Sequence, residues 1–70
     1  MTMKRYWVNK NVDTNPNNDH EVHAEGCHYI PNQKIDLGYH ASCHGAIRVA
    51  KLHYQNVDGC SNCCADCHNQ

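Results

Sequence analysis

The sequence CSNCCADCH begins at Cys60 and ends at His68, and it holds four of the six cysteines of a 70-residue chain. Cys60 and Cys63 form one C-x2-C pair, and Cys64 and Cys67 form a second, which is followed directly by His68. Two residues between two cysteines allow a tight turn that directs both sulfur atoms at one point, as a tetrahedral metal site requires. The pattern predicts a metal knuckle at this end of the chain.

The length and composition set the limits within which this knuckle must fold. Seventy residues accommodate one domain, so residues 1–70 are expected to form a single small metal-binding domain. A domain of this size buries only about 60% of the surface that its unfolded chain exposes. Disulfides or a metal commonly stabilise such scaffolds, and six cysteines with seven histidines supply both options.

The choice between disulfides and metal depends on the redox compartment. The N-terminal sequence MTMKRYWVNK has no apolar run behind its basic residues, which is not the pattern of a secretory signal. No stretch approaches the ~20 apolar residues of a membrane span. If Met1 is the native start, we expect a cytoplasmic protein, whose clustered cysteines favour metal. A trimmed, secreted protein would instead favour disulfides.

Three short stretches have the character of β-strands. Residues 6–8 contain Trp7 between a tyrosine and a valine, and residues 21–23 form a second short run. Residues 35–39 alternate apolar with other side chains, so Ile35, Leu37 and Tyr39 are expected to share one face. Gly38 within this run is expected to permit a bulge or a close approach to a neighbouring backbone. Trp7 or its neighbours are expected to close the core.

One helix is predicted over residues 43–55. Ser42 is a suitable N-cap, and apolar residues then recur at the spacing of one helical stripe. Residues 56–59 are expected to turn the chain into the cysteine cluster. The order predicts an α+β fold, in which one helix packs on a small antiparallel sheet of about three short strands, with a C-terminal zinc knuckle. The members of the stripe are Cys43, Ala46, Ile47, Ala50 and Tyr54.

A closed structural zinc site takes four cysteine and histidine ligands. Cys60 and Cys63 are the first pair, and the best-spaced partners elsewhere are His23 and Cys27, with three residues between them. We therefore predict that Zn²⁺ is bound by His23, Cys27, Cys60 and Cys63. A buried thiol pair or a disulfide is the alternative for Cys60 and Cys63, and an exposed strand position is the alternative for His23.

Other cysteines compete for these roles. Cys64, Cys67 and His68 would replace one or both C-terminal ligands if the knuckle were shifted. Cys43 lies on the buried stripe, where a free cysteine usually acts as a small apolar filler. At a helix N-terminus, its thiol would alternatively be reactive or a fifth ligand.

Three short stretches come close to enzymatic or cofactor-binding motifs. The sequence HEVH at His20 is one residue too short for the H-E-x-x-H motif of zinc proteases. The sequence CADCH at Cys64 matches the C-x-x-C-H pattern of haem attachment, but haem attachment requires export and room for a porphyrin. Redox C-x-x-C motifs open a helix, whereas this one closes the chain. We therefore expect no enzyme, with thiol redox or metal handling through Cys64 and Cys67 as an alternative.

The order H-x3-C, short strand, L-G-Y, Ser-capped helix and C-x2-C resembles the small zinc domain of Ada-type DNA methylphosphotriester repair proteins. The resemblance extends from about Val22 to Cys63, and similar modules end some bacterial competence and nuclease proteins. The chain also resembles a group of short uncharacterised bacterial proteins. In the repair family, C-x3-C and C-x2-C hold the zinc, and a thiolate of the first pair accepts the methyl group. Here His23 replaces the family's first cysteine, so the resemblance implies the zinc site without the repair chemistry.

The formal net charge of −1 and the scattered placement of six lysines and arginines give no basic face. Non-specific DNA binding usually needs such a face. The expected function is therefore a small zinc domain of structural or adaptor type that binds another protein. A DNA-binding module of the Ada kind is the alternative.

Overall fold

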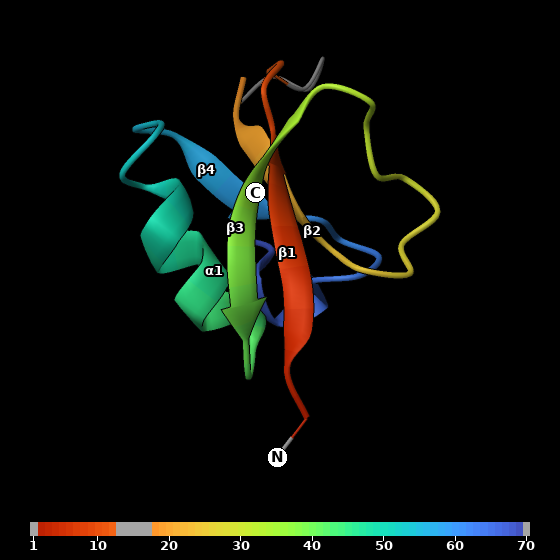
Figure 1. Ribbon diagram of the computed structural model, residues 1–70. Helices are drawn as coiled ribbons and strands as arrows, with labels where there is room; N and C mark the ends of the chain where they lie inside the picture. The colour runs from red at the N-terminus through yellow and green to blue at the C-terminus, as the bar shows by residue number, and fades with distance from the viewer. Residues whose placement is uncertain (1, 13–17, 70) are drawn as a thin grey trace.

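Three antiparallel strands form the centre of the molecule: β1 (Lys4–Asn9), β2 (His20–Ala24) and β3 (Lys34–His40). The computed structural model describes residues 2–12 and 18–69. In it β1 lies between β2 and β3 and pairs with both (Figure 1). These strands contain the three stretches predicted from the sequence. The α+β class is confirmed, and within residues 2–12 and 18–69 one α-helix lies beside a small four-stranded sheet.

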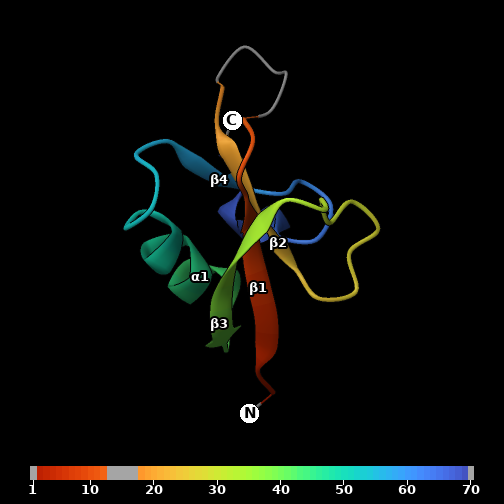
Figure 2. The same ribbon diagram turned by 45° about the horizontal axis from the view of Figure 1, so that its top comes forward.

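A fourth strand, β4 (Val57–Gly59), pairs in parallel with β2, so the sheet is mixed and its order is β3-β1-β2-β4. The sequence predicted a turn here, because Asp58 and Gly59 belong to residue types that are depleted in strands. Parallel neighbours need a long crossover, and β3 with the helix provides it (Figure 2). This crossover brings residues 57–59 back beside β2. They form a strand because they pair with β2, and not because of their own local strand preference.

The helix α1 (Cys43–Ala50) packs on one face of the sheet and buries the predicted stripe. Cys43, Ala46 and Ala50 are buried, and Ile47 packs partly buried against the same core. The small alanine side chains allow the helix to lie close to the strands. Within the described residues, no helix has the length and apolar character needed to cross a membrane.

The helix ends at Ala50, five residues before the predicted end at residue 55. Both His53 and Tyr54 donate their backbone N–H groups to the Ala50 carbonyl, so the last turn tightens and stops. The ring of Tyr54 then stacks on the ring of His20 in β2, with centroids 3.6 Å apart and planes 6° apart. The apolar period extended to Tyr54, but this side chain packs on the sheet from a turn.

A bulge at Leu37 changes which side chains of β3 face the core. Leu37 lies between Asp36 and Gly38, which both have partners in β1, and the register shifts at this point. Gly38 has a φ of +83°, which a glycine adopts readily. Leu37 is buried, whereas Tyr39 is 59% exposed. A bulge beside Gly38 was one of the two predicted alternatives, but the prediction that Tyr39 shares a face with Leu37 was wrong, because the extra residue interrupts the alternation.

Candidate metal centre

Four potential metal ligands from two stretches far apart in the sequence come together beside β2. They are His23 in β2, Cys27 in the turn that follows, and Cys60 and Cys63 after β4. One ligand atom from each residue lies within 4.8 Å of the corresponding atom of every other. The fold thus brings together the four residues predicted from their spacing, in a group that could hold a metal ion.

The alternation of β2 places His23 on the outer face. Its neighbours Val22 and Ala24 are opposite the buried residues Val8 and Tyr6 of β1, so they face the core with α1. His23 must then point to the other face. It is nevertheless only 2% exposed, because the segments that carry the cysteines cover it. A histidine buried outside the apolar core is a sign of a bound or paired imidazole.

Cys27 reaches the site through a tight turn. Its backbone N–H donates to the Ala24 carbonyl at 3.2 Å, which reverses the chain directly after β2. Gly26 has a φ of +87°, a conformation that favours glycine. The glycine before Cys27 therefore turns the cysteine back toward the preceding strand.

The parallel pairing of β4 delivers the second pair of cysteines. The Cys60 N–H donates to the Val22 carbonyl at 2.9 Å and extends the ladder by one bond. The Cys64 N–H then donates to the Cys60 carbonyl at 2.8 Å and closes the turn around Cys63. The Ala24 N–H points at the Cys63 sulfur, 3.3 Å away. Backbone N–H groups that point at sulfur stabilise a thiolate.

Both ring nitrogen atoms of His23 have polar neighbours that orient the imidazole. Its Nδ1 atom lies 3.7 Å from the Cys27 sulfur and 3.8 Å from the Cys63 sulfur. Its Nε2 atom lies 3.6 Å from a carboxylate oxygen of Glu21. A carboxylate behind a histidine is the usual outer partner of a metal-bound imidazole. Sequence reasoning missed Glu21, although residues two apart on a strand share a face.

The thiols of this region are costly to ionise in the absence of a cation. Burial raises the pKa of Cys63 above its ordinary value, and the neighbouring Cys27 thiol raises it further. Burial likewise raises the pKa of Cys64. A divalent cation reverses this preference, since coordinated thiols are deprotonated. The donor set of three sulfur atoms and one nitrogen, buried and close together, fits a soft or borderline metal ion.

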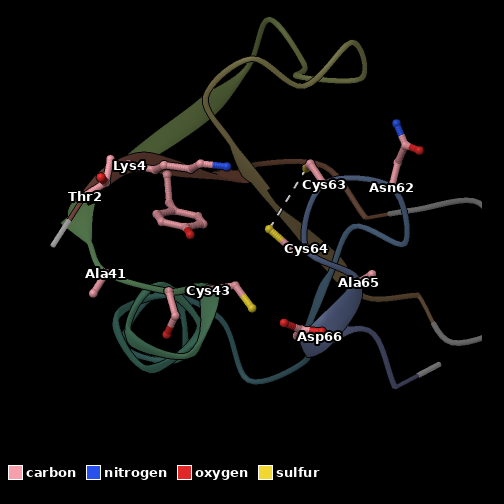
Figure 3. A pocket seen from close by; sticks show the side chains of 11 residues that line it. Thr2, Lys4, Ala41, Cys43, Asn62, Cys63, Cys64, Ala65 and Asp66 are labelled. Carbon is pink, nitrogen blue, oxygen red and sulfur yellow. Dashed lines mark hydrogen bonds between the residues drawn. The ribbon is translucent and has the colours of Figure 1, made fainter.

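The competing candidates lie elsewhere. Cys64 is 2% exposed and packs in the core on the helix side, although its sulfur is 4.0 Å from that of Cys63. It lines a cavity of about 390 Å³ together with Cys43, Cys63 and Tyr6, and Figure 3 shows these cysteines around the cavity. The His68 Nδ1 atom lies 3.0 Å from the Gly59 carbonyl and 3.0 Å from the Asp58 carboxylate.

Cys67 is joined to Cys43 by a disulfide between the helix N-terminus and the short 3-10 helix η1 (Ala65–Cys67). The prediction that Cys43 is a free apolar filler was therefore wrong, as was the reactive-thiol alternative for this state. The two cysteines are 24 residues apart, and no local pattern relates them. A disulfide and a group of potential metal ligands, treated as alternatives from the sequence, thus occur together in one structure.

No family model, curated protein or solved structure matches the chain. The resemblance to the Ada-type zinc domain therefore stays a prediction.

Proposed function

We propose that the chain is a structural zinc-binding domain of adaptor type. The observation that supports this most strongly is the convergence of His23, Cys27, Cys60 and Cys63 within 4.8 Å. Three cysteines and one histidine form a common closed zinc set, in which all four positions belong to the protein. A closed set leaves no position for a substrate, so the proposal includes no catalysis.

Chelation tests this proposal. Zinc binding contributes on the order of 10–16 kcal/mol of apparent free energy in zinc-finger peptides, which exceeds the stability of a few kcal/mol expected from so small a core. We expect a zinc chelator to remove one metal ion and to unfold the chain, measured by native mass spectrometry and circular dichroism. A chelated protein that keeps its helical signal and its thermal midpoint would refute the proposal.

Matched cysteine variants distinguish this site from its neighbours. Cys60→Ser removes a proposed ligand, whereas Cys64→Ser changes a buried thiol in the same loop that lies outside the ligand group. We expect the first variant to lose zinc at micromolar free metal and the second to retain it. Equal loss in both variants would argue that the loop, and not the ligand, was damaged.

The proposed partner is another protein, which would contact the outer face of β1 and β3. The Arg5 guanidinium lies 5.6 Å from the Trp7 ring centroid and 5.9 Å from that of Tyr39. Its charge is matched by a salt bridge with Asp36. This face is thus aromatic and balanced in charge, and aromatic residues with arginine are enriched at protein interfaces.

The alternative, a nucleic-acid module of the Ada kind, is tested with the same residues. Trp7 is the one tryptophan of the chain, so its fluorescence reports on ligands at this face. We expect no change when DNA is added at low salt. A fluorescence change whose affinity falls steeply with salt would favour the nucleic-acid function.

We also propose a cytoplasmic location. Disulfides are rare there and are usually transient, so the Cys43–Cys67 pair would spend time in its reduced form. Alkylation of cell extracts under acid quench would report the fraction of this pair that is reduced.

A further inference from the structure

A second group of potential ligands lies on the helix side of the sheet. One ligand atom each from Cys43, His44 and Cys67 lies within 4.8 Å of the others. Cys43 and His44 begin α1, and Cys67 ends η1. This group shares no residue with the His23 cluster. In the present structure its two sulfur atoms are bonded to each other, so they are not available as thiolates.

We propose that reduction of the Cys43–Cys67 disulfide turns this group into a second metal site, bound by both sulfur atoms and the His44 imidazole. The number of metal ions that the protein binds would then depend on its thiol redox state. Because the two ligand groups are separate, this inference does not require that the proposed function be correct.

A dithiol reductant supplies the electrons and protons that this reduction requires. The reductant gives two electrons and two protons to the disulfide, the S–S bond breaks, and Cys43 and Cys67 become thiols while the reductant becomes a disulfide. A divalent ion then displaces the two thiol protons, which pass to water, and it also accepts the lone pair of the neutral imidazole. Thiolate and imidazole ligands of this kind suit zinc.

The surroundings of the group favour a bound cation over an empty dithiol. Cys43 is 7% exposed and Cys67 is 5% exposed, so two thiolates here would be poorly hydrated without a counter-ion. His44 is exposed and lies at the mouth of the group, with its Nδ1 atom 3.5 Å from the Ser42 hydroxyl. A metal ion can therefore enter from solvent beside His44.

The fourth position is open. A cavity of about 210 Å³ adjoins His44 and Cys67, and Asp66 lines both this cavity and the larger one that contains Cys43. Figure 3 shows the Asp66 carboxylate on η1 in the same view as the Cys43 sulfur. Three protein ligands with a water or carboxylate oxygen in the fourth position differ from the closed set at His23. We expect the second ion to be held less tightly and to exchange faster.

Zinc stoichiometry measured by native mass spectrometry tests the inference. The wild-type protein would be compared in its oxidised form and after treatment with a phosphine reductant, each at a moderate excess of Zn²⁺. We expect one zinc ion in the oxidised protein and two in the reduced protein. A reduced protein that binds no more zinc than the oxidised protein would overturn the inference, whatever the absolute number at the first site.

His44→Ala identifies the ligands of the second ion. His44 is exposed at the start of α1, so its removal is expected to leave the fold, the disulfide and the oxidised stoichiometry unchanged. The reduced variant should bind the second ion at least ten-fold more weakly. His53→Ala, an exposed histidine after the helix, is the matched control and should behave as the wild type. A reduced His44→Ala protein with wild-type affinity for the second ion would refute the role of His44.

Discussion

The contact between Glu21 and His23 explains the role that we propose for Glu21. Its carboxylate lies beside the Nε2 atom of His23, while the Nδ1 atom faces the sulfur atoms. Such a carboxylate fixes the orientation of the ring and raises its basicity as a ligand. Glu21 would therefore be a positioning residue for the proposed metal site, and it lies outside the ligand group.

Glu21→Gln is expected to weaken zinc affinity by about ten-fold, because loss of an outer-shell partner typically costs 10–100-fold. Competition with a chromophoric chelator measures this change. Glu25→Gln is the control, since Glu25 accepts a hydrogen bond from the Arg5 backbone at 2.7 Å and is not in the ligand group. Equal affinities in the two variants would argue against the positioning role.

The Arg5–Asp36 pair is the principal charged contact of the outer face. The hydrogen bond from the Arg5 guanidinium, helped by the Gly38 N–H, lowers the pKa of Asp36 from 3.8 to about 2. A carboxyl group with a depressed folded-state pKa contributes stability above its unfolded pKa and loses it as pH falls through the folded value. The window is therefore between pH 4 and pH 2.

Asp36→Asn is expected to lower stability slightly at pH 6, because the pair is exposed to solvent. The difference between wild type and variant should be smaller in high salt, because salt screens an exposed ion pair. Urea denaturation at pH 6 in low and in high salt, with zinc bound in both proteins, measures it. A difference that grows with salt would contradict the assignment.

At the scale of elements, β4 and the cysteine turn pack backbone against backbone. A Cβ atom added at Gly59 would lie 2.6 Å from the Cys64 carbonyl oxygen and 2.8 Å from the Cys67 Cβ atom. Neither group can withdraw easily, since Cys67 is bonded to Cys43 and the Cys64 N–H closes the turn. Close approach, and not an unusual φ, requires glycine at the end of this strand.

Gly59→Ala is therefore expected to destabilise the protein by about 1–3 kcal/mol, the usual cost of overpacking. Ser61→Ala, an exposed position two residues later, should change stability by less than about 0.5 kcal/mol. The midpoints of denaturant unfolding compare the two variants. An unchanged midpoint in Gly59→Ala would show that stability does not depend on the close approach of β4 to the cysteine turn.

At the scale of the whole molecule, the C-terminal segment is linked to two other elements. The proposed zinc site would attach it to β2 and the turn after it, and the disulfide attaches it to α1. The apolar core between them is small, with Val8 and Val22 as its largest fully buried apolar side chains. The disulfide, and the metal ion that we propose, would thus stabilise what the core alone would hold weakly.

Removal of the disulfide is expected to cost about 3 kcal/mol, because it closes a loop of moderate length in the unfolded chain. The variant Cys43→Ala/Cys67→Ala should melt at a lower temperature than the oxidised wild type but remain folded with one zinc ion bound. Calorimetry with metal analysis checks both statements. A variant that is unfolded with zinc present would mean that the disulfide, and not the metal, dominates stability.

The sequence by itself was enough to predict the features that depend on residues close together in the chain. The helical stripe from Cys43 to Ala50, the strand around Trp7 and the pairing of H-x3-C with C-x2-C all depend on short spacings. Short spacings determine which side chains share a face or a turn, and the α+β class follows from the order of these elements. The group His23, Cys27, Cys60 and Cys63 was predicted in this way, and the fold brings its ligand atoms together.

Only the tertiary structure decided how the remaining cysteines divide. Cys60–Cys63 and Cys64–Cys67 have the same spacing, so sequence cannot rank them. The path of β4 beside β2 settles the matter, because it places Cys60 and Cys63 beside His23 and Cys27, whereas Cys67 is bonded to Cys43 at the start of α1. The Cys43–Cys67 disulfide and the parallel strand arise from this same path, which depends on contacts between segments far apart in the chain.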